Sequence, residues 1–443
     1  MLSKNLTFIR IAVLLAITAG SSIFGAANET VVYPTGSFPQ DVQNVQAAVN
    51  AGGRVRLKAV DINGQPTAFN FGTPENLSGR RVFLLTNVSI SGERIGRNVT
   101  TIRGGNIPFR GKVPVTTSIS GISFEGPRQA AIQLTSSTGT SITDNHVSGV
   151  VGTLTRFGYT FGDGIDVFGY QNPASAITGR VTVSFNRIEN LHADFANGIQ
   201  LDGVAAQSEI IGNTIRDVES NGILVIRSGS TTAIEGNFIV PGPGNGTALL
   251  SYGDGIFIAD GRYSVKLNAI HCENPFADGI SVVGGGFAAA TSQSVIESNR
   301  VEMNGSQFGG ISLYGLVDHS QVSENSIRGN GAFAVLVAEG PDPNDRATYN
   351  RFRENNISRF TSSVGDVLFS SNTANNSYKG RCRSIIDLGV NNDVRCGEGE
   401  DQVFDISVKP RRDFEKIRSA IVNSALTNPL DDYKEWLFEA RMR

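Results

Sequence analysis

Residues 186–226 read NRIENLHADFANGIQLDGVAAQSEIIGNTIRDVESNGILVI, and this stretch decides the fold. Two short motifs alternate within it: Asn-x-Ile begins at Asn186 and Asn213, and Asn-Gly-Ile begins at Asn197 and Asn221. In the second motif apolar residues occupy every other position, which is the periodicity of a β-strand with one buried face. The stretch therefore predicts short strands joined by turns.

Both motifs recur along most of the chain at spacings of 24 to 41 residues. Asn-x-(Ile/Val) begins at Asn145, Asn186, Asn213, Asn237, Asn268, Asn299, Asn325 and Asn355. Gly-Ile-x-(Leu/Val/Ile) begins at Gly164, Gly198, Gly222, Gly255, Gly279 and Gly310, with a degenerate copy over 334–337. Internal repeats of this length indicate a stacked architecture in which each repeat contacts its neighbours.

The connections between the strands favour turns over helices. No apolar stripe of 3.6-residue period is sustained between Gly53 and Val408, so the crossover helices of a doubly wound sheet are excluded. Short strands that recur without helices must coil, and we predict an all-β fold, a parallel β-solenoid whose rungs lie about 4.8 Å apart. In this fold the repeating Asn has a structural role: its amide pairs with the next Asn and satisfies the backbone of the turn.

Both ends of such a coil expose strand edges and need covers. Residues 41–50 predict an amphipathic capping helix that ends at Gly52-Gly53, before a first strand over 54–58. Residues 409–443 predict a C-terminal helical cap, in which Trp436 packs the cap and does not bind a ligand. The β-helix domain is expected to span 27–408.

The composition bounds the partners and the compartment. Lys and Arg total 38, Asp and Glu total 41, and the formal net charge is −3, so no basic domain is present for nucleic acid. Residues 1–26 predict a secretory signal whose apolar run is too short to span a membrane. We therefore expect a secreted, periplasmic or cell-surface protein without membrane insertion. Export makes a bridge between Cys382 and Cys396 plausible and leaves Cys272 over.

The opening helix, the Gly-Gly pair and the Asn-x-Ile and Asp-Gly-Ile rungs together resemble the pectate lyase-like superfamily. That resemblance covers about 370 residues and implies a right-handed single-stranded parallel β-helix. The superfamily includes polysaccharide lyases, hydrolases, epimerases and non-catalytic surface proteins. The sequence lacks the Asn-Thr-Asp, Gly-His-Gly and Arg-Ile-Lys set of polygalacturonases. It also lacks the Tyr-Gly-Phe-Asp-Pro-His signature of mannuronan epimerases and the Gly-rich calcium nonapeptides, so no catalytic family is matched.

Loop lengths locate a face for a ligand. Longer connections near 149–161, 169–179, 240–252, 284–293 and 339–347 flank the Gly-Ile strands, which predicts walls around a groove with the sheet as its floor. Alternation places two columns of residues on that floor: Asp166, Gln200, Leu224, Phe257, Ser281 and Ser312, then Phe168, Asp202, Ile226, Ala259, Val283 and Tyr314. Aromatic rings, carboxylates and amides suit a sugar chain, and we predict that Gln200, Phe168, Tyr170, Phe257 and Tyr314 bind a polysaccharide.

The candidate catalytic residues are Asp202, Asp260, Arg227, Asp166 and His192. Asp202 and Asp260 lie two rungs apart, about 9.6 Å, which is close to the carboxyl separation of inverting glycosidases. Arg227 lies on the rung between them and would act on a carboxylate or a substrate anion. The alternative is that these Asp residues cap turn amides and that the Arg–Asp pairs are solvated surface pairs.

The remaining candidates are less specific. His192 with Asp194 is a candidate base at the groove edge. We predict no metal and no cofactor, with calcium at stacked Asp residues left open. The leading interpretation is an exported β-helix protein that binds, and by carboxylate-based hydrolysis cleaves, a polysaccharide. The alternatives are a polysaccharide lyase that uses Arg or calcium and a non-catalytic surface or adhesive protein.

Overall fold

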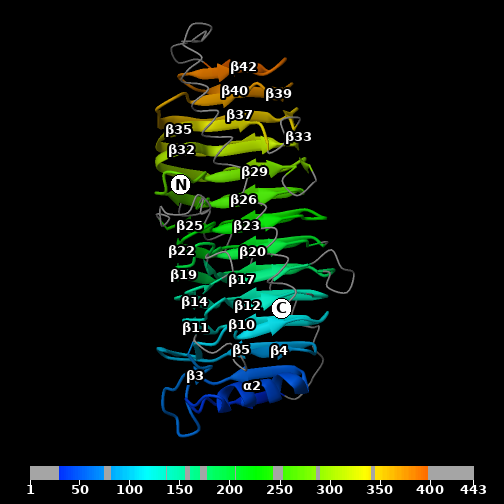
Figure 1. Cartoon of the computed structure of the whole chain (residues 1–443), viewed down its shortest axis with the longest axis vertical. Coiled ribbons are helices and arrows are strands. Elements are labelled where there is room, and N and C mark those ends of the chain that lie inside the picture. The colour runs from blue at the N-terminus through cyan, green and yellow to red at the C-terminus, as the bar shows by residue number, and fades with distance from the viewer. Residues whose placement is uncertain are drawn as a thin grey trace.

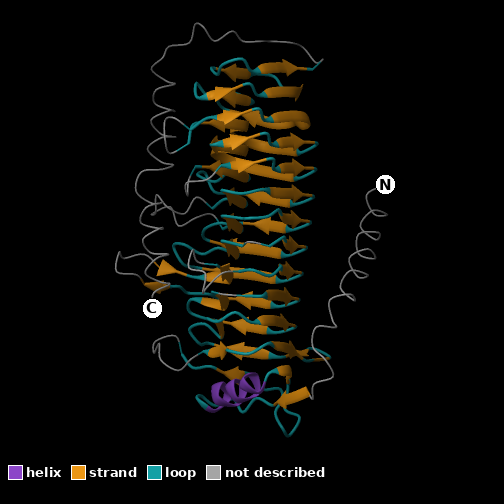
Figure 2. Cartoon of the chain, turned by 90° about the vertical axis from the view of Figure 1, so that its right-hand side faces the viewer, coloured by secondary structure: helices purple, strands orange, loops and turns teal. Residues whose placement is uncertain are grey.

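A computed structural model describes residues 29–73, 81–135, 137–154, 160–169, 177–204, 206–242, 253–285, 290–340 and 345–397 of the 443. Short strands wind into a tall stack, and one helix covers its N-terminal end (Figures 1 and 2). The predicted signal at 1–26, the C-terminal cap at 409–443 and Tyr170 lie outside the described residues.

The Gly-Ile motifs lie on one stack of twelve described strands, which we call the Gly-Ile sheet. Its members, all paired in parallel, are β4 (Val82–Leu84), β9 (Phe109–Gly111), β12 (Ala130–Leu134), β17 (Asp163–Phe168), β20 (Ile199–Asp202), β23 (Ile223–Ile226), β26 (Ile256–Ala259), β29 (Ile280–Gly284), the C-terminal parts of β32 (Arg300–Gly315) and β35 (Ser326–Ala338), β38 (Val367–Phe369) and β41 (Ile385–Asp387).

Two further stacks complete each rung. One contains β1 (Glu29–Val32), β2 (Gly53–Leu57), β5 (Val88–Gly92), β10 (Thr116–Ser120), β13 (Gly139–Thr143), β18 (Val181–Ser184), β21 (Ser208–Ile211), β24 (Thr232–Glu235), β27 (Tyr263–Lys266), β31 (Val295–Glu297), β34 (Gln321–Ser323), β37 (Arg351–Ser362), β40 (Ser377–Arg381) and β42 (Asp393–Cys396). The other contains β3 (Phe69–Asn70), β8 (Thr101–Arg103), β11 (Ser123–Glu125), β14 (His146–Ser148), β19 (Arg187–Leu191), β22 (Thr214–Val218), β25 (Phe238–Val240) and β28 (Ala269–Cys272), and continues into the N-terminal parts of β32 and β35.

Smaller pairings lie at the corners. They are β6 (Arg94–Ile95) with β7 (Asn98–Val99), β15 (Thr153–Leu154) with β16 (Thr160–Phe161), and the stack of β30 (Thr291–Ser292), β33 (Val317–Asp318), β36 (Ala347–Thr348) and β39 (Thr373–Ala374).

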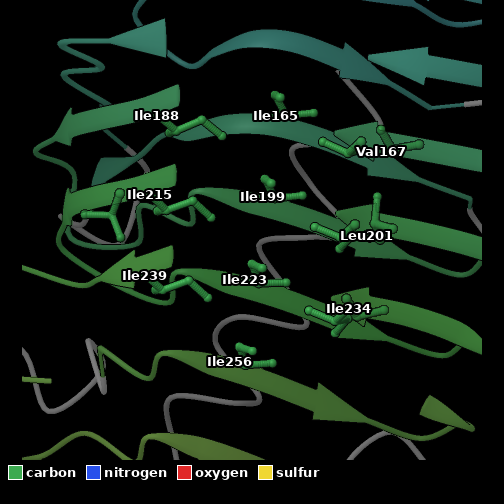
Figure 3. Close-up of a cluster of buried hydrophobic side chains, with 14 of the residues drawn as sticks. Ile165, Val167, Ile188, Ile199, Leu201, Ile215, Ile223, Ile234, Ile239 and Ile256 are labelled. Atoms are coloured by element: carbon green, nitrogen blue, oxygen red, sulfur yellow. The ribbon is translucent and has the colours of Figure 1, made fainter. Parts of the chain in front are cut away.

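The core fills the interior of the coil. Like residues lie over like: Ile165, Ile199, Ile223 and Ile256 follow one another at successive rungs and are fully buried (Figure 3). Burying each such side chain contributes about 1.5–3 kcal/mol, and stacking supplies this contribution on both sides of every rung. The predicted parallel solenoid is confirmed.

The helix α2 (Gln40–Ala51) matches the predicted cap at 41–50 within one residue at each end. It buries Val42, Val45 and Val49 against the first rungs, which shields the otherwise open end of the core. The Asp41 carboxylate accepts hydrogen bonds from the Thr35 and Asn70 amides, at 2.7 and 2.8 Å, and so ties the helix to the coil.

The Asn-x-Ile residues form the predicted ladder. From Asn145 to Asn355, each side-chain Nδ2 donates to the Oδ1 of the next Asn at 2.9–3.1 Å, and the backbone N–H of each donates to the same oxygen. Nδ2 also donates to a backbone carbonyl, as Asn237 does to Ile210. A shorter ladder of Asn350, Asn376 and Asn392, which the sequence motifs do not predict, forms at another turn of the last rungs.

The predicted bridge between Cys382 and Cys396 is present, and Cys272 is a buried free thiol. Among the described residues no helix is long and apolar enough to cross a membrane.

Candidate functional site

The outer face of the Gly-Ile sheet carries the predicted columns in the predicted register. One column runs Phe83, Arg110, Gln133, Asp166, Gln200, Leu224, Phe257, Ser281, Ser312, Leu336 and Leu368. The next runs Phe168, Asp202, Ile226, Ala259, Val283, Tyr314 and Ala338. Both columns therefore follow the predicted alternation at every rung.

The sequence predicts that these residues line the floor of an open groove, but the structure buries most of them. Asp202, Gln200, Asp166 and Tyr314 are all buried, and Phe257 is half-buried. One reason is that outward side chains of neighbouring rungs pack on one another. In the C-terminal half they form a second apolar cluster, outside the core, which includes Leu224, Ile226, Ala259, Val283, Tyr314, Phe333 and Leu336. The centres of several predicted wall loops lie outside the described residues.

Asp202 and Arg227 form a two-pronged ion pair. The Arg227 Nε donates to Asp202 Oδ1 at 2.7 Å and its terminal nitrogen donates to Oδ2 at 2.5 Å. The Asp202 side chain is 0% exposed, whereas that of Arg227 is 23% exposed. Both carboxylate oxygens are therefore engaged, and a ligand approaching from solvent meets the guanidinium first.

Asp260 completes the predicted group. It follows β26 directly, with its backbone in the left-handed region (φ 51°), and it is buried. The hydroxyl of the buried Tyr263 donates to the Ala259 carbonyl. Burial raises the pKa of Tyr263, and the charges of Asp260 and Asp202 raise that pKa further, so both carboxylates act on one hydroxyl. The structure thus brings Asp202 and Arg227 into contact and places Asp260 and Asp202 close enough to act on the same Tyr263 hydroxyl.

His192 does not form the predicted dyad with Asp194. Its Nδ1 lies 3.5 Å from Glu219 Oε1, and its side chain is 54% exposed. The Asp194 carboxylate accepts hydrogen bonds from the amide and hydroxyl of Thr160, at 2.7 and 2.8 Å. Each partner has a local role that adjacency in sequence does not reveal.

Asp166 belongs to a polar cluster on the first rungs of the sheet. Gln133 Nε2 donates to its Oδ2 at 3.0 Å, and Arg110 is buried in the same column. Burial and then the charge of the neighbouring Arg81 lower the pKa of Arg110 to about 10, against the opposing effect of the Asp166 charge. Arg110 and Gln133 were not predicted, because their strands precede the first Gly-Ile motif.

The residues directly before the first five motif glycines form another ladder, which we call the pre-Gly ladder: Asp163, Asn197, Asn221, Asp254 and Asp278. The Asn197 amide and Nδ2 donate to Asp163 Oδ1, both at 3.0 Å, and Asn221 Nδ2 donates to Asn197 Oδ1 at 3.0 Å. Further along, the Asp278 amide donates to Asp254 Oδ1 at 2.8 Å. The sequence shows this ladder as an Asp or Asn before each of these glycines, but it does not indicate that the side chains are buried.

The acids of the pre-Gly ladder have raised pKa values. Burial raises the pKa of Asp163 to about 7. Burial also raises the pKa of Asp278 to about 6, against hydrogen bonds donated by Ser312, Gly309, Tyr314 and Ser281. Burial and then the charge of Asp278 raise the pKa of Asp254. These carboxyls can therefore hold protons near neutral pH.

Within the described residues no three His, Cys, Asp or Glu side chains gather closely enough to hold a metal ion. The acids of the pre-Gly ladder are satisfied by amides and hydroxyls instead, as the hydrogen bonds from Gly309 and Tyr314 to Asp278, at 2.8 and 2.9 Å, illustrate.

Comparisons with known proteins agree with this architecture. The fold is similar to the A-module of a mannuronan C-5 epimerase from Azotobacter vinelandii, at 15% identity over 86% of this chain and 98% of that one, with a TM-score of 0.51. It is also similar to the Dettilon tailspike protein, at 13% identity over 82% of this chain and 68% of that one, with a TM-score of 0.51. No curated protein matches the sequence.

At this level of identity the structural likeness concerns the fold alone. A sequence model described as "Right handed beta helix region" matches residues 76–239 and 197–382, which together cover most of the coil. The chain belongs to the right-handed β-helix family.

Proposed function

We propose that this protein binds a polysaccharide along the outer face of the Gly-Ile sheet and hydrolyses it with carboxylates of that face. The observation that carries the proposal is an in-register outer column on rungs about 4.8 Å apart, in which polar Asp166, Gln200 and Ser281 share one line with apolar Leu224 and Phe257. Sugar hydroxyls need such partners, and Phe257 offers an apolar surface. A mannuronan epimerase with a similar fold supports a polysaccharide as the ligand class.

The proposed chemistry assigns different roles to Asp202 and Asp260. Arg227 pairs with the ionised carboxylate of Asp202, so Asp202 takes the proton from the attacking water and Asp260 gives a proton to the leaving oxygen. The glycosidic C–O bond breaks as the water oxygen bonds to the anomeric carbon. Arg227 would have to release one carboxylate oxygen as the substrate enters.

A non-catalytic glycan-binding protein is the second candidate, and one observation favours it. Asp202 is fully buried beneath Arg227 with both oxygens occupied, which suits a structural pair as well as a poised base. In that case Arg227 and Phe257 would contact the glycan without turnover.

Export is part of the proposal. The predicted signal at 1–26 and the Cys382–Cys396 disulfide both support a secreted or periplasmic protein, because such bridges persist in oxidising compartments. The ligand would therefore be an extracellular or envelope polysaccharide.

The test is a panel of polysaccharides, with reducing ends measured for hydrolysis and ultraviolet absorbance for unsaturated lyase products. We expect new reducing ends from wild type and at least a hundred-fold loss in Asp202→Asn and Asp260→Asn. Glu189→Gln is the matched control, since it removes an ion-paired carboxylate from β19. Full activity in Asp202→Asn would refute the assignment, and retention on immobilised glycan without turnover by wild type would favour the binder.

A further inference from the structure

A column of charged residues on a different sheet changes character along the molecule. On β24, β27 and β31, Glu235, Lys266 and Glu297 lie directly above one another. The charges alternate, and Lys266 Nζ lies 2.7 Å from Glu297 Oε2. Opposite charges on neighbouring strands stabilise a sheet.

The same column becomes wholly cationic on the last rungs. After Ser323 it continues through Arg353, Lys379 and Arg395 on β37, β40 and β42, which we call the cationic column. All three side chains are exposed. Only about 4.8 Å separates their strands, and like charges directly opposite one another are destabilising.

The local acids offset little of this charge. Arg395 Nε donates to Asp393 Oδ1 at 2.8 Å. Arg353 and Lys379 have no ion pair or side-chain hydrogen bond within the described part of the chain. Exposed Arg351 adds another cation to this face, and exposed Glu324 and Glu354 add one acid each at the adjoining turns of two successive rungs. A chain with a formal net charge of −3 therefore concentrates positive charge here.

An exposed aromatic pair lies at the turn that precedes β37, the strand of Arg353. The rings of His319 and Tyr349 stack with centroids 5.0 Å apart at 19°, and Tyr349, two residues before Arg351, is 51% exposed. A ring face beside cations offers contacts to the C–H face of a sugar and to its acidic groups.

We propose that the cationic column is a binding site for a linear anionic polysaccharide with carboxylate or sulfate groups. One cation per rung forms a single line, which fits an extended chain carrying regularly spaced anions. The aromatic pair favours sugars, and the export proposed above would expose the column to extracellular polysaccharide. This site lies on a different sheet from Asp202 and Asp260, and the proposal stands whether or not the protein is catalytic.

The experiment measures binding of the full chain to immobilised polygalacturonate and dextran sulfate, with neutral dextran as the blank, over a range of NaCl concentrations. We expect binding that weakens with salt, and an at least ten-fold further loss in Arg353→Gln/Lys379→Gln. The control Lys266→Gln, which removes a paired cation from the same column, should bind as wild type does. Arg353→Lys keeps the charge and should retain most of the affinity.

Two outcomes would overturn the proposal. One is unchanged binding by the folded double variant, with folding checked by its thermal midpoint. The other is equal affinity for DNA with the same loss on mutation, which would assign the surface to polyanions in general. Reducing-end release depends on Asp202 and Asp260, whereas salt-sensitive retention depends on Arg353 and Lys379, so failure of the hydrolase proposal is distinguishable from failure here.

Discussion

Two ladders of turn residues run along the same coil and differ in one atom type. The ladder from Asn145 to Asn355 consists only of amides, and each member donates and accepts in the same way at every rung. The pre-Gly ladder contains Asp163, Asp254 and Asp278 beside Asn197 and Asn221. The first is buried throughout and the second is buried except at the half-buried Asn221, but only the second can titrate.

The difference shows what burial demands of a repeated polar group. An amide supplies a donor and an acceptor without charge, so the first ladder costs little in desolvation. A carboxyl is a neutral donor and acceptor, as an amide is, only while it holds a proton. Burial therefore raises the pKa values of Asp163 and Asp278. An acid retained at such a position makes stability depend on pH, and it adjoins the face that we propose binds glycan.

The largest loss of stability should follow when an acid is put into the amide ladder with Asn237→Asp. Asn237 Nδ2 donates to the Ile210 carbonyl and to Asn268 Oδ1, and a carboxylate would point an anionic oxygen at both acceptors. We expect a loss of about 3–5 kcal/mol in the free energy of unfolding at pH 8, measured by urea denaturation. The loss should shrink at pH 5, where the new acid can be protonated.

The matched control is Asn392→Asp at the far end of the short ladder, where the side chain is only half-buried. Its cost should be a third or less of that of Asn237→Asp. Equal costs at both positions would mean that burial does not set the energetics of the ladders.

The ladder from Asn145 to Asn355 could be predicted from sequence because every rung needs the same side-chain amide at this turn. One residue type recurs, so spacing alone locates Asn145 to Asn355 and the strands that follow them. The short ladder of Asn350, Asn376 and Asn392 was missed because it occupies few rungs. Alternation likewise predicted both outer columns, since it depends only on local backbone geometry.

The state of the candidate site could not be predicted in the same way. Burial of Asp202 and its pairing with Arg227 depend on where a left-handed residue directs its side chain, and His192 pairs with Glu219 from another rung. Arg110 carries no motif. Such contacts join residues that are distant in sequence and chemically unlike, so the sequence repeat does not predict them.

The converse substitution, Asp254→Asn, makes the pre-Gly ladder more like the amide ladder. A carboxyl whose native pKa is raised binds protons that the unfolded chain has released above about pH 4, so native stability falls as pH rises. The fall should run from about pH 4 through the values of about 6 for Asp278 and about 7 for Asp163. We expect Asp254→Asn to flatten this slope and to gain on the order of 1–3 kcal/mol at pH 8.

The measurement is the free energy of unfolding at several pH values for wild type, Asp254→Asn and the exposed control Glu354→Gln. The control should keep the wild-type slope. A wild-type stability that rises steadily from pH 5 to pH 8, with no change in Asp254→Asn, would contradict the raised pKa values.

The smallest expected effect concerns Tyr314, where the pre-Gly ladder meets the outer face. Its hydroxyl donates to Asp278 Oδ2 at 2.9 Å, and this hydrogen bond holds down a pKa that burial raises. Tyr314→Phe should cost about 0.5–1.5 kcal/mol at pH 8 and move the pH-dependent fall in stability upward, because Asp278 then keeps its proton longer. The ring remains to pack in the outer cluster, so retention on glycan should change little if Tyr314 serves the ladder. A large loss of retention with an unmoved pH profile would instead make the hydroxyl a direct glycan contact, and would place at least one rung of this face within reach of the ligand.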